Sequence, residues 1–534
     1  MSMKNRVARG KGQGARKKDN SRYHLVVLLI LFVFLGSACT SFSNPPRLAT
    51  ATAMAGLPPT ETPEPVVIAA PTATAVSNPN STTPTNLQPN PVLSVWIDET
   101  SAEHEVMLQD MMNNFTSEYG VDVELMLVSP MLLPQLVNTA VLSDTLPDII
   151  IHPLAYTVGW AERGVFDVAL TTEIIDEIGR DTFNADALAL VNTTSGDAAI
   201  PSDGYQQLLI YRADWVEERG LNIPNNYDDM YAFAEAVFDL ENNLTTGFII
   251  PTESNLISTH QAFEHIAAAN GCNLIDEKGE VLILEPACQD ALNFYFRIVN
   301  MFSPPGVQTD TSARNAYLAG RTGMIMTSPD FLPQLAGLDN DAVPTCQECE
   351  SNAAYLAENS GVLTTLAGNN SGTPANFGTV RSLGVTKEAE RETAVLFTNY
   401  WFNEGYAQWL AVDTQRKVPM RQGSINQPRQ FIDAWGNQPL VNNSPNLSDI
   451  FGDVLVLELR ENIATSARWG IQEGQGKLIT QLYEELTLSI VLQEMLSGYF
   501  NSSKTLVEAY NRIVELIPNY QYLIEVEPPD SSDG

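Results

Sequence analysis

Basic residues are scarce in this 534-residue chain, which has 29 Lys and Arg against 64 Asp and Glu. Eight of the basic residues precede position 23, where Asp19 is the one acidic residue, so the rest of the chain has 21 basic and 63 acidic residues. Phosphate backbones and anionic lipid head groups are bound by surplus Lys and Arg and would be repelled by such a body. Nucleic acid is therefore not expected as a partner.

Histidine and cysteine are also rare, with five residues of each. The histidines form no pair at the spacing of a zinc site, and no GxSxG or HExxH motif is present. Segment 470–478, GIQEGQGKL, has the wrong glycine spacing for a phosphate-binding loop and Leu where Ser or Thr would hold magnesium. We expect no metal, cofactor or catalytic motif, although a glycoside hydrolase needs only two well-placed carboxylates and stays an alternative.

Long apolar runs are missing, because the longest, residues 25–35, has only eleven residues where a membrane span needs about 20. It lies between a basic stretch and the small residues Gly36, Ser37 and Ala38, which is the layout of a secretory signal. Cys39 follows, so the segment resembles the lipobox of bacterial lipoproteins, although Leu35 stands four positions before the cysteine instead of three. We predict a signal peptide over 1–38 and lipidation of Cys39; an uncleaved anchor or an ordinary signal peptide are the alternatives.

Two flanking segments lack the composition of a packed domain. Residues 40–91 contain 11 of the 32 prolines together with many Thr, Ser, Ala and Asn. This composition favours an extended spacer, so we predict a disordered tether over 39–91. Residues 521–534 form a short acidic tail, which is also predicted to be disordered.

The four cysteines other than Cys39 can form two pairs. Cys272 and Cys288 bracket a segment with a turn at Lys278 and Gly279, and Cys346 and Cys349 form a CxxC. Disulfides are the default in an exported protein, so we predict the pairs Cys272–Cys288 and Cys346–Cys349. The CxxC could instead be half of a zinc site or a redox motif.

The body alternates strands and helices. Periodicity predicts strands over 92–97, 121–127 and 149–151, with helices over 103–119 and 131–142 between them. This βαβαβ order is typical of a doubly wound α/β sheet, whose ligands bind at the carboxyl ends of the strands. A strand over 208–211 and a helix over 227–240, capped by Asn226, continue the pattern, and the chain is mainly helical from about residue 387.

From residue 92 to about 520 the chain resembles the family 1 extracellular solute-binding proteins of ABC importers, which include the maltodextrin binders. The resemblance rests on the order of segments such as LPDIIIHPLAYTVGWAERGVFDVAL, AIPSDGYQQLLIYRADWVEERGL, YLAGRTGMIMTSPDFL and LSGYFNSSKTLVEAYNRI. No single motif is decisive, and their order over about 430 residues is what carries the likeness.

The resemblance implies a type II periplasmic-binding-protein-like fold, with two α/β lobes joined by crossing segments. Lobe 1 is then expected over 92–205 and 377–415, and lobe 2 over 206–376 and 416–520, with an inserted surface loop over 337–376. The family also implies a small-molecule solute, here a sugar or oligosaccharide, and a membrane permease of an ABC importer as partners. We expect an exported, monomeric, lipid-anchored binding protein that is not an enzyme; a secreted carbohydrate-active enzyme or a sensing or adhesion lipoprotein are the alternatives.

The same resemblance implies which positions face the ligand. Aromatic rings would stack on the apolar face of a sugar, and carboxylates would bind its hydroxyls. His152 stands where the family usually has Trp, and Asp330 falls where Trp is more common. For each position the alternative is ordinary packing or surface solvation. The predicted ligand-binding residues are Asp98, Glu99, Thr100, His152, Tyr156, Tyr205, Asp330, Phe331 and Trp469.

Overall fold

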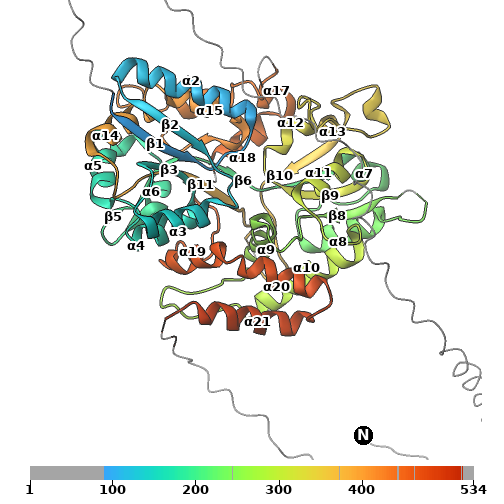
Figure 1. Ribbon diagram of the computed structural model, residues 1–534. Helices are drawn as coiled ribbons and strands as arrows, with labels where there is room; N and C mark the ends of the chain where they lie inside the picture. Colours follow the sequence, from blue (N-terminus) through green and yellow to red (C-terminus); the bar gives the residue numbers. More distant parts are fainter. Residues whose placement is uncertain are drawn as a thin grey trace, which may run out of the picture. The chain divides into compact units, whose positions relative to one another are not determined.

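The computed structural model describes residues 90–518 and 520, except for positions 243, 372, 442, 443 and 462. The predicted signal peptide, Cys39, most of the tether and the acidic tail lie outside the described residues. Figure 1 shows the arrangement of the helices and strands.

The first part of the body forms the alternating strands and helices that the sequence predicts. Helix α2 begins after Ser101, whose hydroxyl accepts a hydrogen bond from the backbone of His104, and ends at Gly120 in the left-handed conformation. The elements up to the first crossing are β1 (Val92–Ile97), α2 (Ala102–Tyr119), β2 (Asp122–Leu127), α3 (Leu133–Ser143), β3 (Ile149–Pro153), α4 (Leu154–Glu162), α5 (Val168–Ile178), α6 (Ala185–Val191), β4 (Asn192–Thr193), β5 (Gly196–Asp197) and β6 (Ile200–Gln206).

The middle of the chain builds a second group of strands and helices. Asn226 caps helix α8 as predicted, but the helix ends at Val237 and not at residue 240. The elements of this part are β7 (Leu208–Arg212), α7 (Ala213–Arg219), α8 (Tyr227–Val237), β8 (Thr246–Ile249), α9 (Ile257–Ala269), α10 (Pro286–Phe302), α11 (Asp310–Leu318), β9 (Thr322–Thr327), α12 (Phe331–Leu335), α13 (Tyr355–Glu358) and β10 (Ser360–Leu363).

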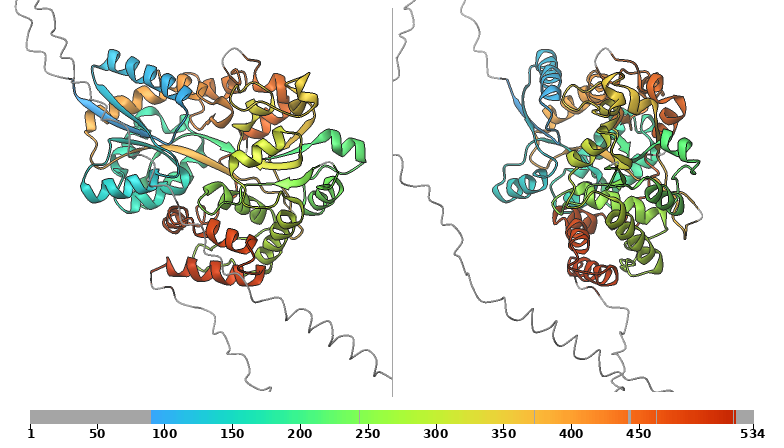
Figure 2. Two further views of the ribbon diagram at one scale, coloured as in Figure 1. Left: turned by 45° about the vertical axis from the view of Figure 1, so that its right-hand side comes forward. Right: turned by 90° about the vertical axis from the view of Figure 1, so that its right-hand side faces the viewer.

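The last part of the chain is mainly helical, as predicted. Figure 2 shows α20 and α21 lying side by side in both views. The elements are β11 (Gly378–Val385), α14 (Arg391–Phe402), α15 (Tyr406–Ala411), the 3₁₀ turn η3 (Thr414–Arg416), β12 (Val418–Pro419), α16 (Gln430–Trp435), α17 (Leu447–Phe451), α18 (Asp453–Glu461), α19 (Gly476–Glu484), α20 (Thr487–Leu496) and α21 (Ser502–Glu515).

The larger strands belong to two separate sheets. One has six strands in the order β12-β6-β11-β3-β1-β2, in which β1 pairs in parallel with β2 and β3. The other has four strands in the order β10-β7-β9-β8. Only Gln207 separates β6 in the first sheet from β7 in the second, and the chain returns to the first sheet at Gly378, where β11 begins. We call the part around the six-stranded sheet lobe 1 and the part around the four-stranded sheet lobe 2.

Two segments differ from the expected layout. Segment 337–376, expected as a surface loop, contains α13 and β10, and β10 pairs with β7 of lobe 2. The segment is rich in Asn, Gly, Ser and Thr, a composition that does not indicate a strand. The four residues of β10 form a strand because they pair with β7. Strand β12 lies within 416–520, which was expected to complete lobe 2, yet it pairs with β6 of lobe 1.

Both predicted cysteine pairs are disulfide-bonded. Cys272 and Cys288 have Cα atoms 4.6 Å apart, and those of Cys346 and Cys349 are 4.9 Å apart. The segment between the first pair turns back on itself, with Ile275 and Val281 forming an antiparallel bridge. None of the helices in the described part of the chain has the length and apolar character needed to cross a membrane.

Candidate solute-binding cavity

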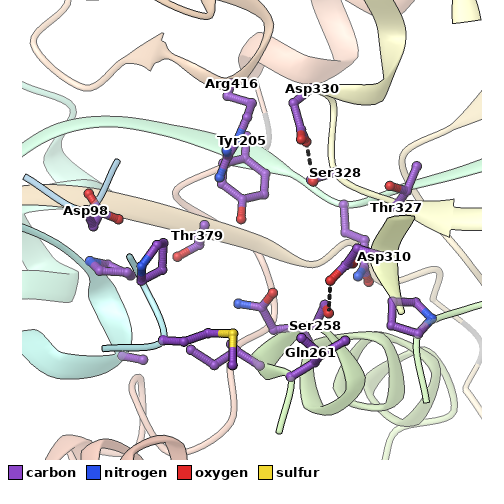
Figure 3. Close-up of a pocket in the computed structure, with 18 of the residues that line it drawn as sticks. Asp98, Tyr205, Ser258, Gln261, Asp310, Thr327, Ser328, Asp330, Thr379 and Arg416 are labelled. Atoms are coloured by element: carbon purple, nitrogen blue, oxygen red, sulfur yellow. Dashed lines mark hydrogen bonds between the residues drawn. The ribbon is translucent and has the colours of Figure 1, made fainter. Parts of the chain in front are cut away.

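A cavity of about 360 Å³ is lined by residues of both lobes (Figure 3). Lobe 1 contributes the end of β1, helix α4 and strands β6 and β11, and lobe 2 contributes α9, α11 and the end of β9. The residues that carry polar or aromatic groups into its walls include Asp98, Tyr156, Tyr205, Thr379, Arg381 and Arg416, with Ser258, Gln261, Asp310, Arg314, Thr327, Ser328, Asp330, Phe377 and Tyr483.

The wall in lobe 1 contains a buried ion pair between Asp98 and Arg381. The Arg381 Nη2 donates to the Asp98 carboxylate and also to the Asp98 backbone oxygen, at 3.1 Å. Burial raises the pKa of Asp98 to about 6, against the opposing charge of Arg381. Strand β11 is thereby tied to the end of β1, although the two strands are not neighbours in the sheet.

The wall in lobe 2 contains a second ion pair, in which Arg314 of α11 binds Asp330. The Arg314 Nη1 lies 2.7 Å from Asp330 Oδ2, and its Nη2 lies 3.0 Å from Oδ1. Such a two-point contact fixes the plane of the carboxylate. Burial favours the protonated form of Asp330, but the charges of Arg314 and Arg416 outweigh it and lower its pKa.

Helix α9 and the start of α11 form the adjoining wall. The Ser258 hydroxyl donates to Asp310 Oδ2 at 2.8 Å, and Gln261 lies one turn further along α9. Both side chains face the cavity beside Asp310 in Figure 3. This wall therefore offers amide, hydroxyl and carboxylate groups, which can both donate and accept hydrogen bonds.

Two tyrosines bring aromatic surface to the cavity from lobe 1. Tyr156 stacks on Trp160, with ring centroids 4.8 Å apart and planes 12° apart. Its hydroxyl is buried and has no hydrogen-bond partner among the described residues. Tyr205 is half-buried on β6, and the Arg416 guanidinium lies over its ring at 4.7 Å.

The cavity combines aromatic faces with hydrogen-bond donors and acceptors on opposing walls. Each buried polar group must find a partner, so a matching solute presents many hydroxyls or similar groups. Among the described residues no cluster of three or more His, Cys, Asp or Glu side chains could hold a metal ion.

The structure brings four of the nine predicted ligand-binding residues to the cavity wall: Asp98, Tyr156, Tyr205 and Asp330. Glu99 and Thr100 follow Asp98 but do not line the cavity. Glu99 instead pairs with His104 at 3.0 Å, and this partner and the charge of Arg381 outweigh burial and lower its pKa.

The remaining three predicted residues lie in the protein core. His152 is fully buried, bonds to Thr157 and the Ile150 oxygen, and stacks on Phe166. Burial lowers its pKa to about 4. Phe331 is fully buried. Trp469 is 4% exposed, and its indole nitrogen donates to the Cys272 oxygen at 2.7 Å.

Sequence reasoning missed most of the polar wall, including Arg381, Arg416, Arg314 and Asp310. The three arginines come from different elements, and only the fold brings them to one cavity. The sequence does contain one signal that could have indicated these arginines. Basic residues are scarce in this chain, and an arginine inside an apolar strand needs a specific acidic partner when it is buried. Arg381 in GTVRSLGV is such a case.

The chain is similar to the putative ABC transporter periplasmic-binding protein YcjN of Escherichia coli strain K12. It is 23% identical over 370 residues, which cover 66% of this chain and 79% of YcjN. No protein-family model matches the chain.

Solved structures with the same fold cover about four fifths of this chain and nearly all of their own. A solute-binding protein of an ABC transporter from Thermotoga lettingae TMO, bound to α-D-tagatose, has a TM-score of 0.62 at 18% identity, with 80% of this chain and 99% of its own covered. The chain has the two-lobe fold of ABC-transporter solute-binding proteins.

Two further members of this fold group carry different ligands. The maltose-bound MalE3 of T. maritima has a TM-score of 0.61 at 16% identity and covers 80% of this chain and all of its own. A solute-binding protein from Agrobacterium radiobacter K84 in complex with ribitol has a TM-score of 0.62 at 15% identity. The match covers 80% of this chain and 99% of that protein. The resemblance found in the sequence is confirmed at the level of the fold.

Proposed function

We propose that this protein is the extracellular solute-binding subunit of an ABC importer and captures a sugar, an oligosaccharide or a related polyol between its lobes. The observation that carries the proposal is the cavity lined from both lobes, where Tyr205 and Tyr156 offer aromatic surface and Asp310, Gln261 and Thr379 offer hydrogen-bond partners. A polyhydroxylated solute uses both kinds of surface.

The comparisons support this solute class. Structures of the same fold hold tagatose, maltose and ribitol, and another from Arthrobacter chlorophenolicus A6 holds laminaribiose. The curated relative is named as a periplasmic-binding protein of an ABC transporter. A binding subunit of this kind releases its solute to a membrane permease. We propose such a permease as the partner and a monomer as the state of this protein.

The N-terminal segment supports the proposal that the protein is located on the outer face of the cell membrane. Its basic stretch, short apolar run and Cys39 fit an exported protein held by a lipid on that cysteine, with residues 39–91 as a tether. Cys39→Ser is expected to release the protein into the soluble fraction after cell fractionation. Unchanged retention in the membrane fraction would contradict the lipid anchor while leaving the solute-binding role intact.

A thermal-shift screen tests the solute class. The panel contains tagatose, maltose, laminaribiose, ribitol and mannitol, with amino acids and polyamines for comparison. A ligand at 100 times its Kd stabilises the folded state by about 2.7 kcal/mol, which is about 3 °C for a body of this size. A shift caused only by amino acids or polyamines would exclude a sugar as the solute. Release of smaller sugars during incubation would favour the secreted-enzyme alternative.

A further inference from the structure

Arg416 differs from the two other arginines of the cavity. Arg314 and Arg381 each bind a carboxylate, whereas no nitrogen of Arg416 donates a hydrogen bond to any residue that the structure describes. A carboxylate oxygen of Asp413 lies 3.8 Å from its Nη1, which is beyond hydrogen-bond distance. The guanidinium therefore keeps free donors beside the cavity.

Arg416 belongs to lobe 1. It ends the turn η3, two residues before β12, and β12 pairs with β6 of the six-stranded sheet. Its guanidinium lies over the ring of Tyr205, which is also on β6, at 4.7 Å. Stacking of this kind holds the planar group in one orientation, so less conformational entropy is lost when it forms a hydrogen bond.

Asp330 belongs to lobe 2. It follows strand β9 and is held by Arg314 through both carboxylate oxygens, and Ser328 donates to Oδ1. A carboxylate has about four acceptor positions, and these contacts fill three. The fourth, on Oδ2, can accept a further donor.

The two residues face each other across the boundary between the lobes. Arg416 and Asp330 lie at the same end of the cavity in Figure 3. Arg314 and Arg416 are the two charges that lower the pKa of Asp330 against the effect of burial, so Arg416 is within electrostatic reach of that carboxylate. No direct hydrogen bond joins Arg416 to Asp330 among the described contacts.

We propose that Arg416 is a positioning residue that couples solute binding to lobe closure, by donating a hydrogen bond to Asp330 when the lobes close over the solute. This inference rests on the proposed function. The closed state then gains an ion pair between the lobes, and because the side chains of Asp330 and Arg416 are 26% and 28% exposed, salt can screen its attraction. A contact that forms only in the closed state shifts the balance of open and closed states toward closure.

Salt dependence separates this role from direct contact with the solute. A neutral sugar carries no charge, so its binding has no ionic term of its own. If closure forms the Arg416–Asp330 pair while the cavity is still partly open to solvent, salt weakens the attraction and the affinity falls. A hydrogen bond from Arg416 to a sugar hydroxyl would leave the affinity nearly independent of salt.

The experiment measures the Kd for each neutral sugar of the panel by titration calorimetry, at about 0.02 M and about 0.5 M NaCl. For a sugar that binds, we expect the Kd of the wild-type protein to rise several-fold with salt. In Arg416→Gln the Kd is expected to be about tenfold higher at low salt and nearly the same at both salt concentrations. Small-angle scattering should show that the sugar reduces the radius of gyration less in Arg416→Gln than in the wild type.

Two further variants control the interpretation. Arg429→Gln removes the same charge from an exposed ion pair with Asp433, outside the cavity, and should behave like the wild type. Arg416→Lys keeps the charge but not the planar group, so it should retain part of the salt dependence even if Arg416→Gln folds poorly.

Each outcome decides between the proposals. If the wild type binds a sugar with a Kd that does not change with salt, and Arg416→Gln closes normally, the coupling is wrong and the proposed function stands. If no sugar binds to the wild type, the proposed function fails and the coupling fails with it.

Discussion

The guanidinium of Arg381 binds the carboxylate of Asp98 inside lobe 1, with both side chains less than 10% exposed. A buried ion pair contributes little net stability, because both ions lose their hydration. Removal of one partner is costly, because the other charge stays buried without compensation. The pair therefore fixes the geometry of the cavity wall more than it stabilises the fold.

Arg381→Met is expected to lower the free energy of unfolding by about 3–5 kcal/mol at pH 7. Asp98 would then be a buried carboxylate without its cation. Its pKa, already raised to about 6 by burial, would rise further, so the loss should be smaller at pH 5 than at pH 7. Urea unfolding at the two pH values measures this difference, and Arg429→Gln on the surface should show none. An equal loss at both pH values would show that the charge of Asp98 is not the cause of the destabilisation.

Because His152 is buried, we expect the protein to lose stability in acid. Burial lowers its folded-state pKa to about 4, below the value of about 6.5 in the unfolded chain. Its contribution to stability is therefore fully present above about pH 6.5 and is lost as the pH falls toward 4, for a total of about 3 kcal/mol. The comparison is urea unfolding of the wild type and His152→Gln between pH 7 and pH 4.5. The wild type should lose more stability than the variant; parallel curves would show that His152 is not held neutral.

The two disulfides should differ in their contribution to stability. Cys272–Cys288 closes a loop with a sequence separation of 16, and Cys346–Cys349 one with a separation of 3. Loop-closure entropy predicts a loss of about 3 kcal/mol for the Cys272→Ser/Cys288→Ser double variant and about 2 kcal/mol for Cys346→Ser/Cys349→Ser. Urea unfolding of both variants tests the order. A larger loss from the second pair would show that contacts in the folded state outweigh the entropy of the unfolded chain.

Tyr205 should contribute to solute affinity through its ring. Tyr205→Ala removes the aromatic surface and the support for Arg416, so the Kd for a bound sugar is expected to rise about 10- to 100-fold, or about 1.4–2.8 kcal/mol. Tyr205→Phe keeps the ring and should change the Kd less. Phe115→Leu alters a buried ring of the lobe 1 core outside the cavity and serves as the control, with lower stability but an unchanged Kd. Equal effects of Tyr205→Ala and Phe115→Leu on affinity would remove Tyr205 from the site.

The fold could be predicted from the sequence where periodicity is local. Helix α2 and strand β1 follow from side-chain spacing within about 30 residues of chain. Strand β10 could not be predicted this way, because its four residues are fixed by antiparallel pairing with β7, about 150 residues earlier. Pairing between distant segments leaves little trace in local composition.

The candidate site was less accessible to sequence reasoning. Asp98 and Asp330 could be placed because Asp98 directly follows β1 and Asp330 comes three residues after the end of β9, and α/β folds bind ligands at such strand ends. Phe331 is one residue beyond Asp330, and its side chain packs into the core beside Tyr317. Arg381 is 283 residues from Asp98, and only the sheet order brings the two together.

Titration calorimetry of the purified protein with the neutral sugars and polyols of the panel measures directly whether the cavity binds a carbohydrate. We expect that at least one of them binds with saturable heat at one site per chain, that the heat returns to baseline after each injection, and that Tyr205→Ala weakens the binding. Heat that continues after each injection would reveal turnover of the sugar. Binding of none of them would contradict the proposal that this cavity holds a carbohydrate or polyol.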